Sequence, residues 1–270
     1  MKKRITGNSL LVTFILFVTV SCTTVPLTGR RQLSLVPESE MISLSLTQYG
    51  QFLKDNKVST DQAKTAMVRR VGQRISKAVE TYMAQQGLSD NLKGYQWEFN
   101  LIEDKTVNAW CMSGGKVVVY TGLLPVSQND EGLATVLGHE IAHAVARHGS
   151  ERMSDQMLVQ LGSTSLSAAM SSKPKETQAM ANAAFGIGSQ VGVLLPFSRK
   201  QENEADYMGL IFMAMAGYNP NASLAFWERM AQQSQTSTPE FLSTHPVNST
   251  RIENIKQKLP EAMKYYKPSK

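Results

Sequence analysis

The chain has 270 residues, of which 42% are hydrophobic, so it is long enough to fill one sizeable core. Its formal charge is +6 at pH 7, but three basic side chains lie at positions 2–4, and without residues 1–21 the charge falls to +3. A charge that small removes the main support for a nucleic-acid-binding role.

The N-terminal segment is typical of an exported protein. The basic residues at positions 2–4 precede an apolar stretch from Leu10 to Val20, which is too short to span a bilayer permanently. Cys22 follows Thr19-Val20-Ser21, which resembles a bacterial lipoprotein box, although Thr19 departs from the usual leucine. We therefore expect residues 1–21 to be a signal peptide and Cys22 to be lipidated, leaving one domain over residues 22–270. A simple secretory signal and an uncleaved anchor are the alternatives.

Two helices are predicted next, over Pro37 to Asn56 and Ser59 to Gln86. For the second helix, Ser59 and Gln62 have the spacing of a capping box and Gly87 follows as a stop.

Three short strands follow the helices. Alternation of apolar and polar residues predicts a strand from Tyr95 to Leu101, and the segments Val107 to Met112 and Lys116 to Tyr120 flank a Ser-Gly-Gly turn. Cys111 lies in the middle strand. With Cys22 lipidated it has no disulfide partner, and a nucleophilic role would need an orienting histidine, for which His245 is the only spare one. We expect Cys111 to be a strand side chain.

The run Gly138-His139-Glu140-Ile141-Ala142-His143 contains the HExxH pattern. Histidines at i and i+4 of a helix lie on one face, so both imidazoles can bind one cation, and Glu140 is placed to face a water held there. Asn129 and Asp130 are candidate N-caps and Gly149 is the predicted stop. His148 lies about 140° around the helix from His143, so we interpret it as a basic residue near the helix C-terminus.

The composition then shifts between residues 154 and 196 to Ala, Ser, Gly, Met and Leu, with a break predicted at Lys173-Pro174-Lys175. The apolar stretches Met180 to Phe185 and Ile187 to Leu195 suit core helices. Their small residues and their position also suit a mobile lid or a membrane-contacting loop.

A third ligand is expected on the next helix. Ser198 with Gln201 resembles a capping box at its start, and Gly217 with Pro220 ends it. Glu202 and Asp206 share one face at i and i+4, so Glu202 can supply a ligand carboxylate while Asp206 accepts a hydrogen bond from a ligand histidine. Glu204 points elsewhere.

These motifs together resemble a known family. HExxH, the downstream run Ser198-Arg199-Lys200-Gln201-Glu202-Asn203-Glu204-Ala205-Asp206 and the segment Ser243-Thr244-His245-Pro246 with Arg251 are similar to gluzincin zinc metallopeptidases related to the CAAX prenyl protease. Within that family the likeness is greatest to the Oma-type and bacterial β-barrel assembly-enhancing members, in a single-domain lipoprotein form.

The resemblance implies an α+β fold, a mainly helical zincin-like domain with a small β-sheet beside the HExxH helix. It implies one Zn²⁺ held by His139, His143 and Glu202, with Glu140 as general base and Asp206 behind the ligands. His245 is expected to approach the metal, either to steady the oxyanion or to plug the open position. The alternative for His245 is a helix cap before Pro246.

Two further roles follow from the resemblance. Arg251 is expected to be an oxyanion donor or a structural residue, the alternative being a charge on a helix surface. Asn108, Ala109 and Trp110 are expected on an edge strand that pairs with an extended substrate; the alternative is an interior strand.

An extended substrate suggests that the protein clears unfolded or misfolded envelope proteins. We therefore predict a zinc endopeptidase of protein quality control, held by a lipid anchor in a bacterial envelope and facing the periplasm, with the outer membrane favoured. The alternative is a chaperone-like assembly factor with a normally closed metal site. Storage of zinc is disfavoured because such a site has no use for Glu140. The sequence indicates no oligomeric state.

Overall fold

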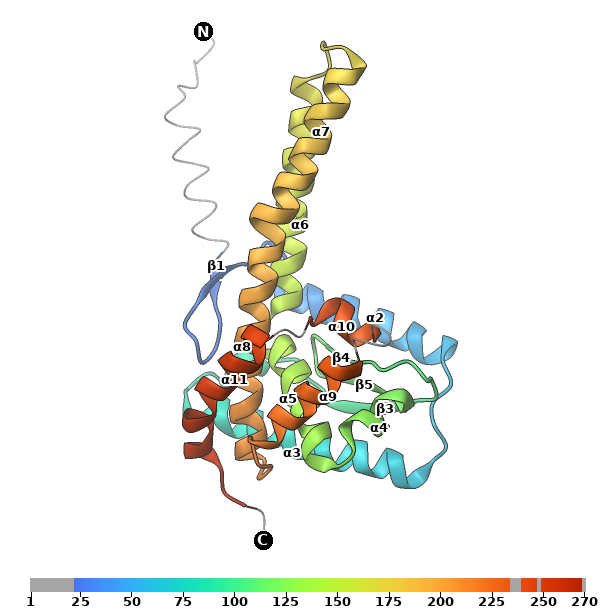
Figure 1. The fold of residues 1–270 in the computed structure, drawn as a ribbon, viewed down its shortest axis with the longest axis vertical. Helices are drawn as coiled ribbons and strands as arrows, with labels where there is room; N and C mark the ends of the chain where they lie inside the picture. The colour runs from blue at the N-terminus through green and yellow to red at the C-terminus, as the bar shows by residue number, and fades with distance from the viewer. Residues whose placement is uncertain (1–21, 234–238, 247–248, 269–270) are drawn as a thin grey trace.

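The computed structural model describes residues 22–233, 239–246 and 249–268 of the chain, so the predicted signal peptide, residues 1–21, lies outside the described residues. The described part is mainly helical, with a three-stranded sheet and a short N-terminal β-hairpin (Figure 1). This arrangement confirms the predicted α+β class.

The three-stranded sheet lies between helices. It consists of β3 (Glu98–Ile102), β4 (Ala109–Met112) and β5 (Lys116–Tyr120) in the order β3-β5-β4, with β3 parallel and β4 antiparallel to β5. Helix α2 (Glu38–Asp55) packs Tyr49 and Phe52 on one face, while α3 (Gln62–Gln85) and α5 (Asp130–Val145) cover the other. The sheet is therefore buried on both sides.

The predicted start of the first strand, at Tyr95, is wrong. The strand begins at Glu98, and residues 99–102 are all buried instead of alternating, because helices cover both faces of the sheet. Tyr95 instead donates its hydroxyl to the carbonyl oxygen of Ala144 at the end of α5, at 2.9 Å.

The predicted capping box of α3 is also wrong. Asp61 is the N-cap and accepts a hydrogen bond from the backbone N–H of Lys64. Ser59 is instead bound to strand β3, because its backbone N–H donates to the carbonyl oxygen of Leu101 at 2.8 Å. The predicted stop at Gly87 is confirmed, since its φ of +68° ends the helix.

Helix α5 ends earlier than predicted. Arg147 adopts a left-handed conformation, with φ of 60°, and α6 (His148–Ala169) begins directly after it, so Gly149 lies inside α6. The side chain of Gln32 donates to the carbonyl oxygen of Ala146 at 2.7 Å. A contact from the N-terminal hairpin thus satisfies one of the orphaned carbonyls where α5 stops.

Helices α6, α7 (Lys175–Ser189) and α8 (Leu195–Met215) form a hairpin that projects from the domain (Figure 1). A π-helical turn over Gln190–Leu194 joins α7 to α8, so the helix start predicted at Ser198 is wrong. Gln201, the other half of that predicted box, is buried and bonds to Arg152 and Glu151. The break at Lys173-Pro174-Lys175 is confirmed.

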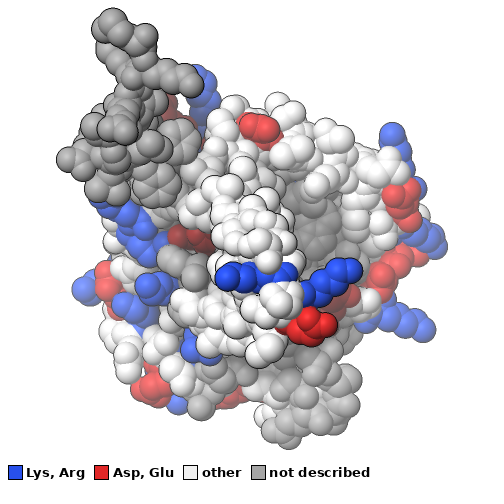
Figure 2. All heavy atoms as spheres, turned by 90° about the horizontal axis from the view of Figure 1, so that it is seen from above, with Lys and Arg blue, Asp and Glu red and all other residues white. Residues whose placement is uncertain are grey.

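The projecting hairpin is not a core element. Helix α7 has no buried residue, and Leu161, Met180 and Ile187 are 63%, 74% and 67% exposed. Figure 2, which looks down on the hairpin, shows mainly uncharged residues along it, with basic and acidic side chains at its near end, where the turn carries Lys173, Lys175 and Glu176. The alternative of core helices for this segment is therefore wrong, while the lid and the membrane-contacting loop stay predictions. Among the described residues, no helix combines the length and the apolar character needed to cross a bilayer.

The remaining elements complete the domain. The N-terminal hairpin pairs β1 (Cys22–Thr24) with β2 (Arg31–Leu33), and short turns of helix lie at Ser89–Leu92, Thr121–Leu123 and Met263–Tyr265. Helices α4 (Leu124–Ser127) and α9 (Ala222–Gln233) pack on α5, whereas α11 (Ser249–Ala262) packs on α8. The short helix α10 (Glu240–Thr244) leads into His245.

Helices α5 and α8 cross at a pair of glycines. A Cβ atom added to Gly138 would lie 2.8 Å from the carbonyl oxygen of Gly209, and one added to Gly209 would lie 2.9 Å from the backbone nitrogen of His139. Only glycine permits this separation of the two backbones. The crossing lies beside His139, so it also sets the distance between the motif helix and Glu202.

We expect Gly138→Ala to lower the free energy of unfolding by about 1–3 kcal/mol, the usual cost of forcing added atoms into a packed core. Urea denaturation would measure the loss. Gly186→Ala in α7 is the matched control, because no described residue outside its own stretch of helix lies within 4 Å of its added Cβ, and alanine favours the helix by up to about 1 kcal/mol. Equal effects of both substitutions would contradict a close crossing.

Candidate metal centre

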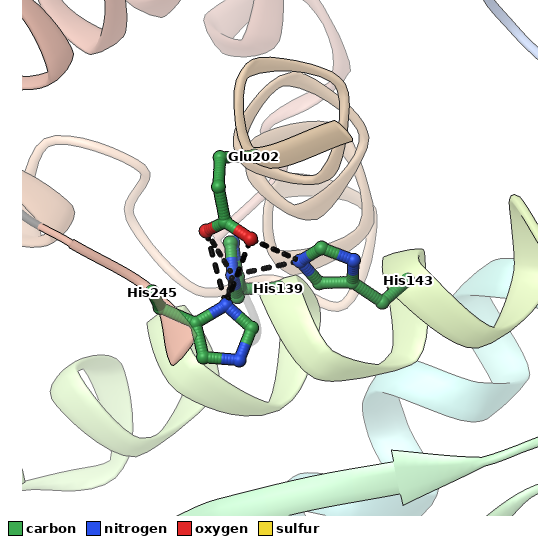
Figure 3. A group of neighbouring side chains, drawn as sticks. All are labelled: His139, His143, Glu202 and His245. Carbon is green, nitrogen blue, oxygen red and sulfur yellow. Dashed lines mark hydrogen bonds and ion pairs between the residues drawn. The ribbon is translucent and has the colours of Figure 1, made fainter. Parts of the chain in front are cut away.

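Four buried side chains meet where α5, α8 and the segment after α10 come together (Figure 3). They are His139 and His143 of α5, Glu202 of α8, and His245. One donor atom from each lies within 4.8 Å of the other three. The structure therefore brings together the three predicted ligands and the predicted fourth residue.

The distances between these donors suit one small cation. Four ligand atoms about 2.0 Å from an ion at the centre of a tetrahedron lie about 3.3 Å from one another. The Nε2 atoms of His139 and His143 are 3.1 Å apart, and each is 3.2–3.3 Å from a carboxylate oxygen of Glu202. Nδ1 of His245 lies 3.2 Å from Nε2 of His139 and 3.0 Å from Glu202. The remaining pair, His143 and His245, lies within 4.8 Å, so the residues present fit a site for one small cation.

Glu140 lies beside this group. Its Oε1 atom is buried and has no hydrogen-bond partner among the described residues, while Nε2 of His245 lies 3.5 Å away. Burial raises the pKa of Glu140 above its usual value. An orphaned carboxylate oxygen next to a metal-type donor set is unusual in a protein interior and marks a site that holds a polar group or a water.

Behind His139 lies an ion pair. Nδ1 of His139 is 2.9 Å from Asp206, and Arg251 binds the same carboxylate through Nε and Nη2, each at 2.8 Å. The guanidinium of Arg251 also stacks over Trp227, 3.8 Å from the ring centre. Arg251 is only 4% exposed, so the alternative of a charge on a helix surface is wrong.

His245 is the C-cap of α10 and its ring stacks on Phe241, with centroids 4.7 Å apart. Helix α11 begins at Ser249, three residues after Pro246, so Pro246 is not the first residue of a helix. The alternative, in which His245 caps the N-terminus of a helix that begins at Pro246, is therefore wrong. Nη1 of Arg251 donates to the carbonyl oxygens of His245 and Pro246, which fixes this loop against the ligands.

Sequence reasoning missed the support behind His143. His148 is fully buried rather than a basic residue at a helix end, and its Nδ1 lies 2.8 Å from Nδ1 of His143. Its Nε2 lies 3.1 Å from Glu204, which is also buried. The only local signal was the proximity of His148 to the motif, because Glu204 reaches it from a different helix.

Charge in the group follows from these contacts. Burial lowers the pKa of His139, but Asp206 and Glu202 outweigh burial and raise it to about 9. Burial holds the pKa of His143 well below its usual value, despite Glu202. Burial raises the pKa of Glu202, but the surrounding histidines outweigh it and keep this carboxylate ionised. A cation and protons compete for the same nitrogens, so metal affinity falls as pH falls.

Asp155 of α6 provides a pH prediction away from the ligands. Burial, and then repulsion from Glu151, raise its pKa to about 6. The folded protein therefore binds more protons than the unfolded chain between about pH 4 and 6, so stability falls as pH rises through that range. We expect Asp155→Asn to stabilise the protein by up to about 3 kcal/mol above pH 6 and to have little effect near pH 4.

Urea unfolding of metal-free protein at pH 4.5 and 7.5 measures this effect, with Asp90→Asn, at an exposed residue, as the control. A gain of the same size at both pH values would contradict a raised pKa for Asp155.

A cleft of about 390 Å³ opens onto the group. Its lining includes β4 with the preceding Asn108, Met41, Ser45 and Gln48 of α2, and the metal-centre residues Glu140 and His245. Strand β4 is at the sheet edge, so the alternative of an interior strand is wrong. Burial raises the pKa of Cys111 well above its usual value, which disfavours a thiolate nucleophile.

The fold and this centre define a metallopeptidase of the HExxH gluzincin class. The motif helix supplies two histidines and a glutamate whose Oε1 atom has no hydrogen-bond partner among the described residues, and a glutamate from a second helix joins the donor set.

The chain belongs to peptidase family M48, whose model matches residues 69–259. It is 39% identical over 190 residues to the mitochondrial metalloendopeptidase OMA1 of Schizosaccharomyces pombe, covering 70% of this chain and 53% of that protein. It is 29% identical over 259 residues to the human OMA1 metalloendopeptidase, covering 93% and 48%. It is 31% identical over 178 residues to the β-barrel assembly-enhancing protease of Escherichia coli, covering 60% and 34%. The chain spans about half the length, or less, of these relatives.

Proposed function

We propose that this protein is a zinc-dependent endopeptidase of cell-envelope protein quality control. His139, His143 and Glu202 hold the ion, and Glu140 is the general base. The observation that carries the proposal is the close spacing of four buried donors next to Oε1 of Glu140, which has no hydrogen-bond partner among the described residues. Bound zinc would supply a Lewis acid and lower the pKa of a coordinated water.

The residues of this chain then have separate tasks. Glu140 accepts a proton as the peptide carbonyl is attacked and returns it to the leaving amine, for which its burial and raised pKa are suited. Asp206 accepts from Nδ1 of His139 and so directs Nε2 toward the ion. Arg251 neutralises Asp206 and braces the loop of His245, which is a structural task.

We propose that His245 plugs the open ligand position at rest. Its Nδ1 lies within 3.2 Å of both His139 and Glu202, so it completes a four-donor set and leaves little room for a substrate carbonyl. Three ligands are enough for a catalytic zinc site, while a fourth closes it.

For His245→Ala we expect zinc to be retained and the rate of cleavage of an unfolded substrate to rise by up to about 10-fold. A rise of this size corresponds to a wild-type protein in which about a tenth of the molecules have the ligand position open at rest. Initial rates at equal zinc content measure this change. Lower activity with zinc intact would instead assign His245 to oxyanion stabilisation.

The cleft supports a preference for unfolded substrates. Strand β4 lies at the sheet edge and, with the preceding Asn108, lines the cleft, so Asn108, Ala109 and Trp110 can pair with an extended peptide through main-chain hydrogen bonds, which tolerate many sequences. A folded protein has no free strand to offer. The name of the E. coli relative refers to β-barrel assembly, and we propose misfolded or unassembled envelope proteins as the substrates.

The proposed location is a bacterial envelope, facing the periplasm, with a lipid on Cys22 as the membrane anchor and the outer membrane favoured. The lipoprotein-like sequence before Cys22 supports this location, as does the similarity to the E. coli relative. The mitochondrial relatives share the peptidase domain and not necessarily the compartment.

The test is metal content combined with cleavage. We expect one zinc per chain, hydrolysis of casein or of an unfolded outer-membrane protein, and little hydrolysis of the same protein once it is folded. Removal of zinc by a chelator should stop cleavage and its return should restore it. Metal-free protein that cleaves equally well would overturn the proposal.

A second function is favoured by one observation, the closure of the donor set by His245. A chaperone-like assembly factor would keep this site closed and act by holding clients. Rescue of a deletion phenotype by the Glu140→Gln form would support that function over proteolysis.

A further inference from the structure

The N-terminal β-hairpin contacts two buried acids near the metal centre. Arg30, in the loop just before β2, binds both carboxylate oxygens of Glu151 on α6, at 2.5 and 2.7 Å. Its Nε atom donates to Glu204 of α8 at 2.8 Å, and the hydroxyl of Thr28 donates to the other oxygen of Glu204. The N-terminal hairpin thus contacts both α6 and α8 near the metal centre.

Both acids depend on this contact. Glu151 and Glu204 are only 1% and 6% exposed, and a buried carboxylate is stable only when it is paired. Glu151 also accepts from Gln201 at 2.7 Å, but Arg30 is the cation that touches both carboxylates among the described residues.

Glu204 in turn reaches a metal ligand through His148. If Nε2 of His143 binds the ion, its Nδ1 carries the remaining hydrogen of the neutral ring and donates it. The acceptor is Nδ1 of His148, 2.8 Å away, which leaves the hydrogen of His148 on Nε2, 3.1 Å from the carboxylate of Glu204. One arrangement of hydrogens satisfies the whole chain from His143 to Glu204.

Arg152 also approaches this chain. Its Nη2 lies 3.2 Å from Nδ1 of His143. Once the ion is bound, both of these nitrogens carry hydrogens, so they cannot hydrogen-bond to each other. Arg152 retains an acceptor in Gln201, at 2.7 Å from its Nε, so it does not replace His148 as the partner of His143.

We propose that the N-terminal hairpin, residues 22–33, is a positioning element of the metal centre: Thr28 and Arg30 hold Glu204 so that His148 orients the ligand His143. Each ligand histidine is then supported by a carboxylate of α8. Asp206 contacts His139 directly, whereas Glu204 acts on His143 through His148. The proposal rests on the proposed metal site.

A consequence concerns the predicted anchor. Cys22 is the first residue of β1, six positions before Thr28. A lipid on Cys22 would attach the protein to a membrane through the same hairpin that supports a metal ligand, so undocking of the hairpin would weaken zinc binding.

The test compares Arg30→Met with Arg31→Met in the full chain. Arg31 is the neighbouring residue, is exposed and makes none of these contacts, so it matches the loss of one arginine. The measurements are the zinc dissociation constant by chelator competition, the visible spectrum of the Co²⁺-loaded protein, and the melting temperature with and without zinc.

We expect Arg30→Met to weaken zinc binding by about 10-fold or more, in the range found for partners behind metal ligands, and to change the Co²⁺ spectrum. The rise in melting temperature on adding zinc should shrink, because that rise depends on the affinity. Arg31→Met should resemble the wild type in all three measurements.

A purely structural role of the hairpin predicts another pattern, in which Arg30→Met lowers the melting temperatures with and without zinc equally and leaves the affinity and spectrum unchanged. That pattern would overturn the inference. If Arg30→Met does not fold, Thr28→Val decides, since it removes one neutral donor to Glu204: weaker zinc binding supports the inference, and wild-type affinity overturns it. A wild-type protein that binds no zinc would instead refute the metal site itself.

Discussion

Replacing Glu140 by glutamine is expected to leave zinc bound while peptidase activity falls by at least about 10³-fold, within the range attributed to general acid-base catalysis. Glutamine has the shape of glutamate but cannot accept the proton in the cleavage step. The amide also removes a buried charge whose Oε1 atom has no hydrogen bond within the described part of the chain, so we expect the variant to be at least as stable as the wild type.

Zinc per chain, the initial rate on casein and the melting temperature together check this expectation. Glu228→Gln, at an exposed residue of α9, is the matched control and should behave as the wild type. Full peptidase activity in the Glu140→Gln protein would remove Glu140 from the mechanism.

Replacing Glu202 by glutamine is expected to abolish both metal binding and cleavage. Glu202 is the only carboxylate in the donor group and lies within 3.3 Å of three histidines and Arg251. An amide offers no charge to the cation, so we expect zinc affinity to fall by more than the roughly 10- to 100-fold typical of residues behind the ligands. His143→Ala should have the same two effects.

Zinc titration against a chelator at pH 7.5 measures both variants, and cleavage assays at saturating zinc show whether activity can be recovered. Glu253→Gln, at an exposed position of α11, controls for loss of one charge near the site. Affinity within a few-fold of the wild type in Glu202→Gln would show that the third ligand is a different residue.

The elements that could be predicted are those whose signal is local. The i, i+4 spacing of His139 and His143, and of Glu202 and Asp206, defines a helix face whatever the rest of the chain does, and both pairs lie on that face in the structure. The approach of His245 came from resemblance to a family and not from spacing, because a loop residue has no periodicity to fix its position.

The predicted helix ends failed where a distant contact competed with a local one. Ser59 has the spacing of a cap, but its backbone hydrogen-bonds to Leu101 in the sheet. Ser198 also has that spacing, yet it lies inside α8, and Gln201 makes a buried contact with Glu151 instead of capping a helix. A capping side chain contributes about 1 kcal/mol to the free energy of folding, and tertiary contacts readily contribute more.

The sequence by itself determined the chemistry available to this protein: two imidazoles, a neighbouring carboxylate and a distant Glu202 suited to a divalent cation. Only the tertiary structure decided how that set is supported. Arg30 meets Glu151 and Glu204 across 121 and 174 residues of chain, and the α5–α8 crossing requires glycine at both Gly138 and Gly209. Ligand spacing along a helix is a local geometric property, whereas pairing of buried charges depends on which segments the folded core brings into contact.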